Sequence, residues 1–237
     1  MNRNDRKSAV AILIVVLTIL VGGTAWIMHG ASFSSADRGE VIATVDGESI
    51  YLQDAVWRVD GLTTTHGGDA QSLGSEWQDR VLQSLVDDVV IRQEADRRGI
   101  AVTDQQIADD LLGLQEMFAT LDEYQTWLGS QGIDQDELER RIRLQRLAVD
   151  VYEAVTSGVT VSTSDVRTYF QAHRTEYAGS DGSPASFLDV QDAIQQQLEK
   201  EEKDAVYAAW LDEQRGTVDV VVLDEDWWRS VGDEQQG

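Results

Sequence analysis

The chain has 237 residues, and its 43 Asp and Glu against 19 Lys and Arg give a formal net charge of −24 at pH 7. So acidic a surface repels polyanions, and we expect no nucleic acid among the partners, because nucleic acids bind through Lys and Arg that neutralise phosphates. Solubility is the simplest reason for the acidity, and attraction of basic protein clients is the alternative. The absence of cysteine excludes disulfides, thiol nucleophiles, cysteine-bound zinc and an acylated lipoprotein.

An apolar run without charged residues, Ala9–Met28, lies close to the N-terminus. As a helix its 20 residues would span about 30 Å, the thickness of a bilayer's hydrocarbon core. Three basic residues, Arg3, Arg6 and Lys7, precede the run and are opposed only by Asp5. This asymmetry predicts a single-pass anchor with the N-terminus in the cytoplasm and the bulk of the chain extracytoplasmic, in the bacterial periplasm or on the cell-wall side.

We therefore expect residues 1–30 to form the cytoplasmic N-terminus and transmembrane anchor, and residues 31–39 to form a linker. A cleaved signal peptide is the alternative, because Ser34 and Ala36 place small side chains at the two positions that a signal peptidase inspects before Asp37. The apolar run is longer than the roughly 7–15 residues of a usual signal core, which favours the anchor.

Two short runs of β-favouring residues flank Asp46-Gly47 within the segment Val41–Ile50. The Asp-Gly pair suits the positive backbone angles of a tight hairpin turn. The one late strand candidate is Val218–Leu223. Because a lone strand leaves backbone groups without partners, we expect it to join the hairpin in a small antiparallel sheet.

Between these strand segments the apolar residues recur at three- and four-residue steps, which predicts a mainly helical domain. The clearest helix runs from about Ser75 to Arg98 and is followed by Gly99, a typical C-terminal stop. Further helices are predicted by capping residues at their starts and by periodic apolar side chains. They begin at Thr103, Asp134 and Ser162, with a short helix at 123–128 and a long one from Ser186 to about Gly216.

The segment Val41–Ile50 (VIATVDGESI) resembles the start of the SurA/PrsA/PpiD-like extracytoplasmic foldases, which reads V-A-x-V-N-G-E-x-I. Further segments resemble motifs of the same family in the same order. They are Leu82–Val90, Arg97–Asp104, Gly132–Ile142 and Val159–Tyr177, and the final helix with VDVVVL resembles the closing segment. The resemblance implies a SurA N-terminal-like helical chaperone domain over residues 40–177, with residues 186–223 closing the same domain. It also implies that the clients are unfolded or newly translocated polypeptides.

The chain departs from the family where residues 178–185 form a short linker, because a parvulin isomerase domain is usually inserted there. A parvulin site also relies on a pair of histidines, and this chain has only His29, His66 and His173. We therefore expect no prolyl isomerase activity and no enzyme. Of the three histidines, only His66 lies in a plausible ligand-bearing loop, and an exposed turn residue is the better interpretation. Residues 224–237 are expected to be an acidic tail.

Acidic pairs such as Asp87-Asp88 and Asp109-Asp110 belong to no calcium, phosphate or zinc motif. In a chain this acidic, solvated helix faces explain such pairs. We therefore expect no metal and no other cofactor.

Apolar and aromatic side chains crowd the junction between two predicted short helices. These candidate client-binding residues are Met117, Phe118, Leu121, Tyr124, Trp127 and Leu128. Adaptable apolar side chains of this kind suit the capture of unfolded chains where they are exposed. The alternative is that they belong to the core, because aromatic residues at helical spacing are usually buried. Trp227 and Trp228 either cap the sheet or lie at the membrane interface.

The sequence thus predicts a mainly α fold: a helical SurA-N-like domain, a small antiparallel sheet made by the N-terminal hairpin and a C-terminal strand, and one transmembrane helix. Two functions remain open. The first is a membrane-anchored extracytoplasmic chaperone, a holdase for unfolded polypeptides. The second is a structural or scaffolding membrane protein whose helical ectodomain binds one dedicated partner or itself, as a homodimer.

Overall fold

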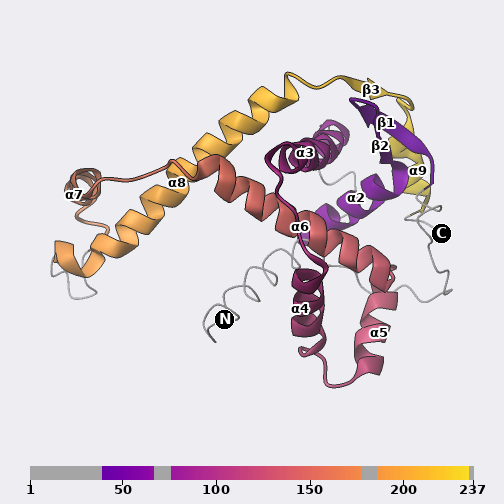
Figure 1. The fold of residues 1–237 in the computed structure, drawn as a ribbon, viewed down its shortest axis with the longest axis horizontal. Coiled ribbons are helices and arrows are strands. Elements are labelled where there is room, and N and C mark those ends of the chain that lie inside the picture. Colours follow the sequence, from indigo (N-terminus) through magenta and orange to yellow (C-terminus); the bar gives the residue numbers. More distant parts are fainter. Residues whose placement is uncertain (1–38, 67–75, 178–185, 235–237) are drawn as a thin grey trace. The chain divides into compact units, whose positions relative to one another are not determined.

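The computed structural model of the chain describes residues 39–66, 76–177 and 186–234. Over these residues the protein is mainly helical with one three-stranded antiparallel sheet, which confirms that part of the predicted fold class (Figure 1). The predicted anchor, Ala9–Met28, lies outside the described residues. Among the helices that are described, none combines the length and the apolar character needed to cross a membrane.

The chain divides into two compact units. Unit 1 comprises the residues up to Val149 together with those from Thr217 onward, and unit 2 comprises Asp150–Gly216. The sequence-based division of the chain, in which residues 186–223 close the domain of residues 40–177, stays a prediction. The division into two units arises because the long C-terminal helix packs within unit 2, and only the strand after it pairs with the N-terminal hairpin.

The sheet of unit 1 joins the two ends of the described chain. Strands β1 (Val41–Val45) and β2 (Glu48–Tyr51) form a hairpin, and β3 (Val220–Val222) pairs antiparallel with β1, so the order is β2-β1-β3. The predicted late strand and its partner are thereby confirmed. At the turn Asp46 has φ 50° and Gly47 has φ 84°, the left-handed angles that an Asp-Gly turn requires.

Helices α2 (Leu52–His66), α3 (Trp77–Arg98) and α9 (Trp227–Glu234) build the rest of this part of unit 1. His66 was predicted to lie in a loop, whereas it is the last residue of α2. Residues 224–237 were predicted to be an acidic tail, whereas Trp227–Glu234 form helix α9. Among the acidic residues of this segment, Trp227 and Val231 form a short apolar face, and both are buried. Trp227 meets Trp77 edge to face at 5.8 Å, so the first tryptophan of the pair caps the core.

A helical arm completes unit 1. It consists of α4 (Asp104–Gln115), α5 (Leu121–Ser130) and the first part of α6 (Gln135–Thr156). The starts predicted for α4 and α6 are confirmed, because the Thr103 hydroxyl accepts a bond from the Gln106 amide and the Asp134 carboxylate accepts one from the Glu137 amide. Their shared apolar cluster is the arm's own core. Its buried members include Ile107, Leu111, Leu114, Leu138 and Ile142.

Helix α6 also contacts α2 within unit 1. The guanidinium of Arg141 lies 4.3 Å from the ring centroid of Trp57, and that of Arg140 lies 5.4 Å from it. Burial lowers the pKa of Arg141 to about 10, so the side chain keeps its charge at neutral pH. Glu137 forms ion pairs with both arginines and balances that charge.

Unit 2 contains the end of α6, α7 (Thr163–Ala172) and α8 (Phe187–Arg215). Helix α7 begins with the predicted capping box of Ser162 and Asp165. Val166 and Phe170 of α7 pack against Ile194 of α8 in a small core. Nearer its C-terminus, α8 contacts the end of α6. There the hydroxyl of Tyr152 donates to Asp204 at 2.9 Å, and its ring lies edge to face with Tyr207 at 5.1 Å.

Candidate functional site

The α4–α5 arm owes its shape to local capping at the turn between the two helices. The amide of Glu123 donates to the Thr120 hydroxyl at 3.2 Å, and the Glu123 carboxylate accepts a bond from the Ala119 amide at 2.9 Å. These reciprocal bonds satisfy backbone groups that would otherwise lack partners at the start of α5. They fix the short turn that carries Met117 and Phe118.

Three aromatic rings form one cluster beside this turn. Phe118 lies 5.6 Å from Tyr124 and 5.5 Å from Trp127, and Tyr124 stacks on Trp127 at 6.1 Å, all measured between ring centroids. Aromatic pairs in such geometries add about 0.5–1.5 kcal/mol each beyond area burial. The cluster therefore makes the tip of the arm a firm platform.

The structure separates the six candidate residues by exposure. Tyr124 and Leu128 are buried and belong to the core of the arm, as in the alternative interpretation of the sequence. Phe118 and Trp127 are half-buried and pack on that core. Met117 and Leu121 are exposed to 54% and 61%. Of the six residues, Met117 and Leu121 therefore offer the most exposed apolar side chains to another chain.

One exposed apolar residue on the arm was missed by the sequence analysis. Leu112 of α4 is 56% exposed, although its neighbour Leu111 is buried. Successive helical residues are about 100° apart around the axis, so a residue directly after a core position points away from the core. The pattern Ile107, Leu111, Leu114 contained this signal, because Leu112 does not belong to its periodicity.

Tyr124 is the most deeply placed polar group of the cluster. Burial raises the pKa of its phenol, while Gln115 acts in the opposite direction. Its hydroxyl has no hydrogen-bond partner of normal geometry among the described residues. The phenol therefore remains protonated at neutral pH, and its ring packs in the aromatic cluster.

Two arginines of α6 bind α4 and the residues just before it. Arg143 donates to the carbonyl of Val102 at 2.7 Å and to the carboxylate of Asp104 at 2.8 Å. Arg146 forms a two-pronged ion pair with Asp110 in the middle of α4. These contacts hold α4 against α6 and so fix the position of the exposed apolar residues of the arm.

In the described part of the chain, no group of three or more His, Asp or Glu converges as a metal site.

Comparisons with known proteins agree with this fold. A family model described as a SurA-like N-terminal domain matches residues 1–151, which is more than half of the chain. A solved structure from work on the SurA-like chaperones of Campylobacter jejuni, the virulence factor PEB4 and the periplasmic protein Cj1289, is similar with a TM-score of 0.53. The identity is 12%, and the match covers 78% of this chain and 99% of the other. A comparison with curated proteins found no significant match.

Proposed function

The chain belongs to the family of SurA-like N-terminal domains, and from this premise we propose that it is an extracytoplasmic chaperone that holds unfolded or newly translocated polypeptides. The observation that carries the proposal is the pair Met117 and Leu121, exposed at the tip of an arm whose aromatic core and arginine braces keep it rigid. A large exposed apolar side chain gains about 1–2 kcal/mol when an unfolded chain covers it. Several such contacts give weak and reversible capture, which suits a holdase.

The test replaces both exposed residues, Met117→Ser and Leu121→Ser, in one variant. Because neither side chain is buried, the melting temperature should stay within about 2 °C of the parent. Suppression of aggregation of chemically denatured rhodanese should fall at least twofold. The matched control is Leu188→Ser, which removes an exposed leucine of α8 in unit 2. Full suppression by the Met117/Leu121 variant would refute this surface as the client site.

We also propose that the protein has no prolyl isomerase activity. The support is the short stretch between Tyr177 and Ser186, where family members usually carry a parvulin domain. The purified chain should not accelerate cis–trans conversion of a proline test peptide above the uncatalysed rate. Acceleration that survives repurification would contradict the proposal.

The proposed anchor is Ala9–Met28, with the N-terminus in the cytoplasm. The intact chain should be found in the membrane fraction of the cells. Protease added outside spheroplasts should then digest its ectodomain. A mature N-terminus at Asp37 would show a cleaved signal peptide instead.

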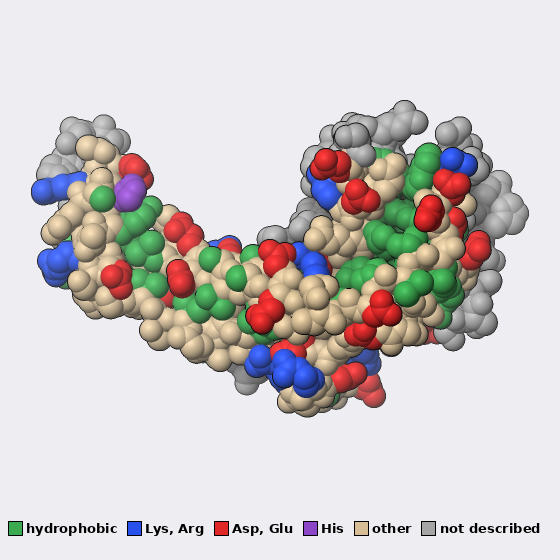
Figure 2. Space-filling view, turned by 90° about the horizontal axis from the view of Figure 1, so that it is seen from above, with side chains coloured by type: hydrophobic (Ala, Val, Ile, Leu, Met, Phe, Trp, Pro, Cys, Tyr) green, Lys and Arg blue, Asp and Glu red, His purple; other side chains and the backbone are tan. Residues whose placement is uncertain are grey.

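A second function, a scaffold that binds one partner or itself, is favoured by one observation. The edge strand β3 exposes Val220, Val221 and Val222, and Leu223 after it is also exposed. Figure 2 shows apolar side chains on the surface at the end that holds the sheet, with acidic side chains around them. Exposed apolar edge strands readily pair with another chain. If Val221→Lys converts a dimer into a monomer without affecting client holding, β3 serves assembly.

A further inference from the structure

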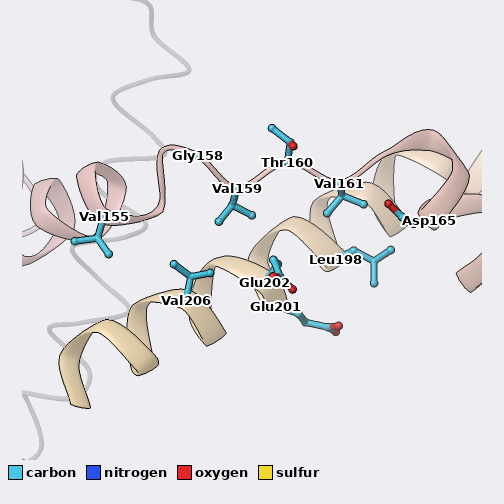
Figure 3. Close-up of a pocket in the computed structure, with 10 residues that line it drawn as sticks. All are labelled: Val155, Gly158, Val159, Thr160, Val161, Asp165, Leu198, Glu201, Glu202 and Val206. Atoms are coloured by element: carbon cyan, nitrogen blue, oxygen red, sulfur yellow. The ribbon is translucent and has the colours of Figure 1, made fainter. Parts of the chain in front are cut away.

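Unit 2 contains a cavity of about 710 Å³ that belongs to none of the surfaces described above (Figure 3). It lies between the segment that links α6 to α7 and the middle of α8, and it is open to solvent. Its volume is within the range of about 300–1,000 Å³ that proteins use for ligands.

Apolar side chains form one part of the cavity wall. Val159 and Val161 of the linking segment point toward α8, and Val206 of α8 points back toward that segment (Figure 3). Val155 and Leu198 also line the space. All five side chains are half-buried, so the protein itself covers them incompletely. An apolar side chain of a ligand would complete their burial.

Three carboxylates lie at the edge of this apolar space: Asp165, Glu201 and Glu202. Within the described residues, none of them forms an ion pair with Lys or Arg. Asp165 accepts bonds from Ser162, and Glu201 accepts one from Gln197 at 2.9 Å. The nearby cations are engaged elsewhere, since Lys200 pairs with Asp204 and Lys203 pairs with Glu153. The edge of the cavity therefore attracts an external cation.

The linking segment offers a third feature. Thr160 and Val161 make no backbone hydrogen bond with another described residue, although their neighbours Val159 and Ser162 do. An extended chain that lies along this segment can pair with these backbone groups, as a peptide does when it adds to a strand.

We propose that this cavity binds an extended polypeptide segment in which Lys or Arg alternates with apolar residues. The apolar side chains enter between the linking segment and α8, and the cationic side chains reach Glu201, Glu202 and Asp165. The inference deepens the proposed chaperone function, on which it rests: it assigns a second contact point and a preference for basic segments to the same protein.

The test uses the full chain and two labelled nonapeptides, one alternating Leu with Lys and one alternating Leu with Glu. A photoreactive residue replaces Gly158, which lines the cavity and has open space where an added Cβ would lie. The Leu/Lys peptide should crosslink at position 158 and bind at least tenfold more tightly than the Leu/Glu peptide.

The double variant Glu201→Gln/Glu202→Gln should weaken binding of the Leu/Lys peptide by about fivefold, because exposed ion pairs are individually modest. The matched control, Asp192→Asn/Glu213→Gln, removes two exposed charges of the same helix outside the cavity and should leave binding unchanged. Unchanged binding by the Glu201/Glu202 variant, equal binding of both peptides, or displacement of the peptide by equimolar spermidine would overturn the inference. These results leave the holdase test at Met117 and Leu121 unaffected, so failure of the cavity and failure of the proposed function are distinguishable.

Discussion

At the scale of single residues, Glu94 of α3 is the carboxylate on which acid stability depends most clearly. It is 3% exposed, and Arg97 and Arg98 both hold it. Burial alone would raise its pKa, but the hydrogen bonds and charges of the two arginines together outweigh burial and lower the pKa below its ordinary value of 4.5.

A lowered carboxylate pKa stabilises the fold above the unfolded-state pKa, and this stabilisation is lost as the pH falls through the folded-state value. Glu94→Gln should therefore lower the free energy of unfolding by about 1–3 kcal/mol at pH 7. The difference from the parent should shrink as the pH falls below about 4.5. Urea unfolding across this pH range measures it, with the exposed neighbour Asp96→Asn as control. A difference that does not change with pH would contradict this account.

The phenol of Tyr124 leads to the opposite expectation. Its hydroxyl is buried and has no hydrogen-bond partner of normal geometry among the described residues, and such a group costs about 1–3 kcal/mol of desolvation. Tyr124→Phe keeps the ring in the aromatic cluster, so the melting temperature should stay level or rise.

The control for Tyr124 is Tyr152→Phe, because the Tyr152 hydroxyl donates to Asp204 at 2.9 Å. Losing that bond should lower the free energy of unfolding by about 0.5–1.5 kcal/mol. Differential scanning calorimetry of both variants decides the matter, and a clear loss of stability in Tyr124→Phe would show that its hydroxyl has a partner.

At the scale of elements, the C-terminal strand and helix hold unit 1 together. Strand β3 pairs with β1, and the Asp46 and Asp219 backbones are linked by a bond of 2.9 Å. Truncation after Gly216 removes β3 and α9, and it should cost several of the roughly 5–15 kcal/mol that stabilise a typical domain.

Truncation after Leu223 separates the two contributions, because it removes α9 with the buried Trp227 and leaves β3. Loss of a buried tryptophan alone costs about 3–5 kcal/mol. In chemical unfolding, the free energy of unfolding should be highest for the parent, lower for the chain that ends at Leu223, and lowest for the chain that ends at Gly216. If the shorter chain melts within a degree or two of the parent, β3 and α9 do not close the fold.

Elements with a strong local signal were predictable from the sequence. The Asp46-Gly47 turn and the capping residues Thr103 and Ser162 act through neighbours two or three positions away, so the sequence alone specifies them. Helix α9 was missed because its two buried residues, Trp227 and Val231, lie among acidic residues in the sequence, and their burial depends on contacts with the rest of unit 1, such as that of Trp227 with Trp77.

The candidate site shows the same limit. Periodicity placed Tyr124, Trp127 and Leu128 on one helix, but it could not tell which of them would be covered by α4 and α6. That depends on tertiary contacts such as those of Arg143 and Arg146 with α4. The cavity of unit 2 was equally invisible, since its walls come from segments about 40 residues apart in the sequence.

At the scale of the whole molecule, the protein combines a small sheet that ties the chain ends, an arm with an exposed apolar tip in unit 1, and a cavity in unit 2 lined by apolar and acidic side chains. Acidic side chains are spread over the visible face of both units (Figure 2). A net charge of −24 opposes aggregation through the exposed apolar residues, because like-charged copies of the molecule repel each other. Binding of many different basic or neutral clients is compatible with this charge.

The most direct test of the central claim is photocrosslinking in intact cells with a photoreactive residue in place of Leu121, which is 61% exposed at the tip of the arm. The same residue in place of Gln105, an exposed polar position of α4, is the control. A holdase predicts a broad series of adducts of many masses from position 121 and few from position 105. A single discrete adduct at position 121 would contradict client holding and identify a dedicated partner or a second copy of the chain.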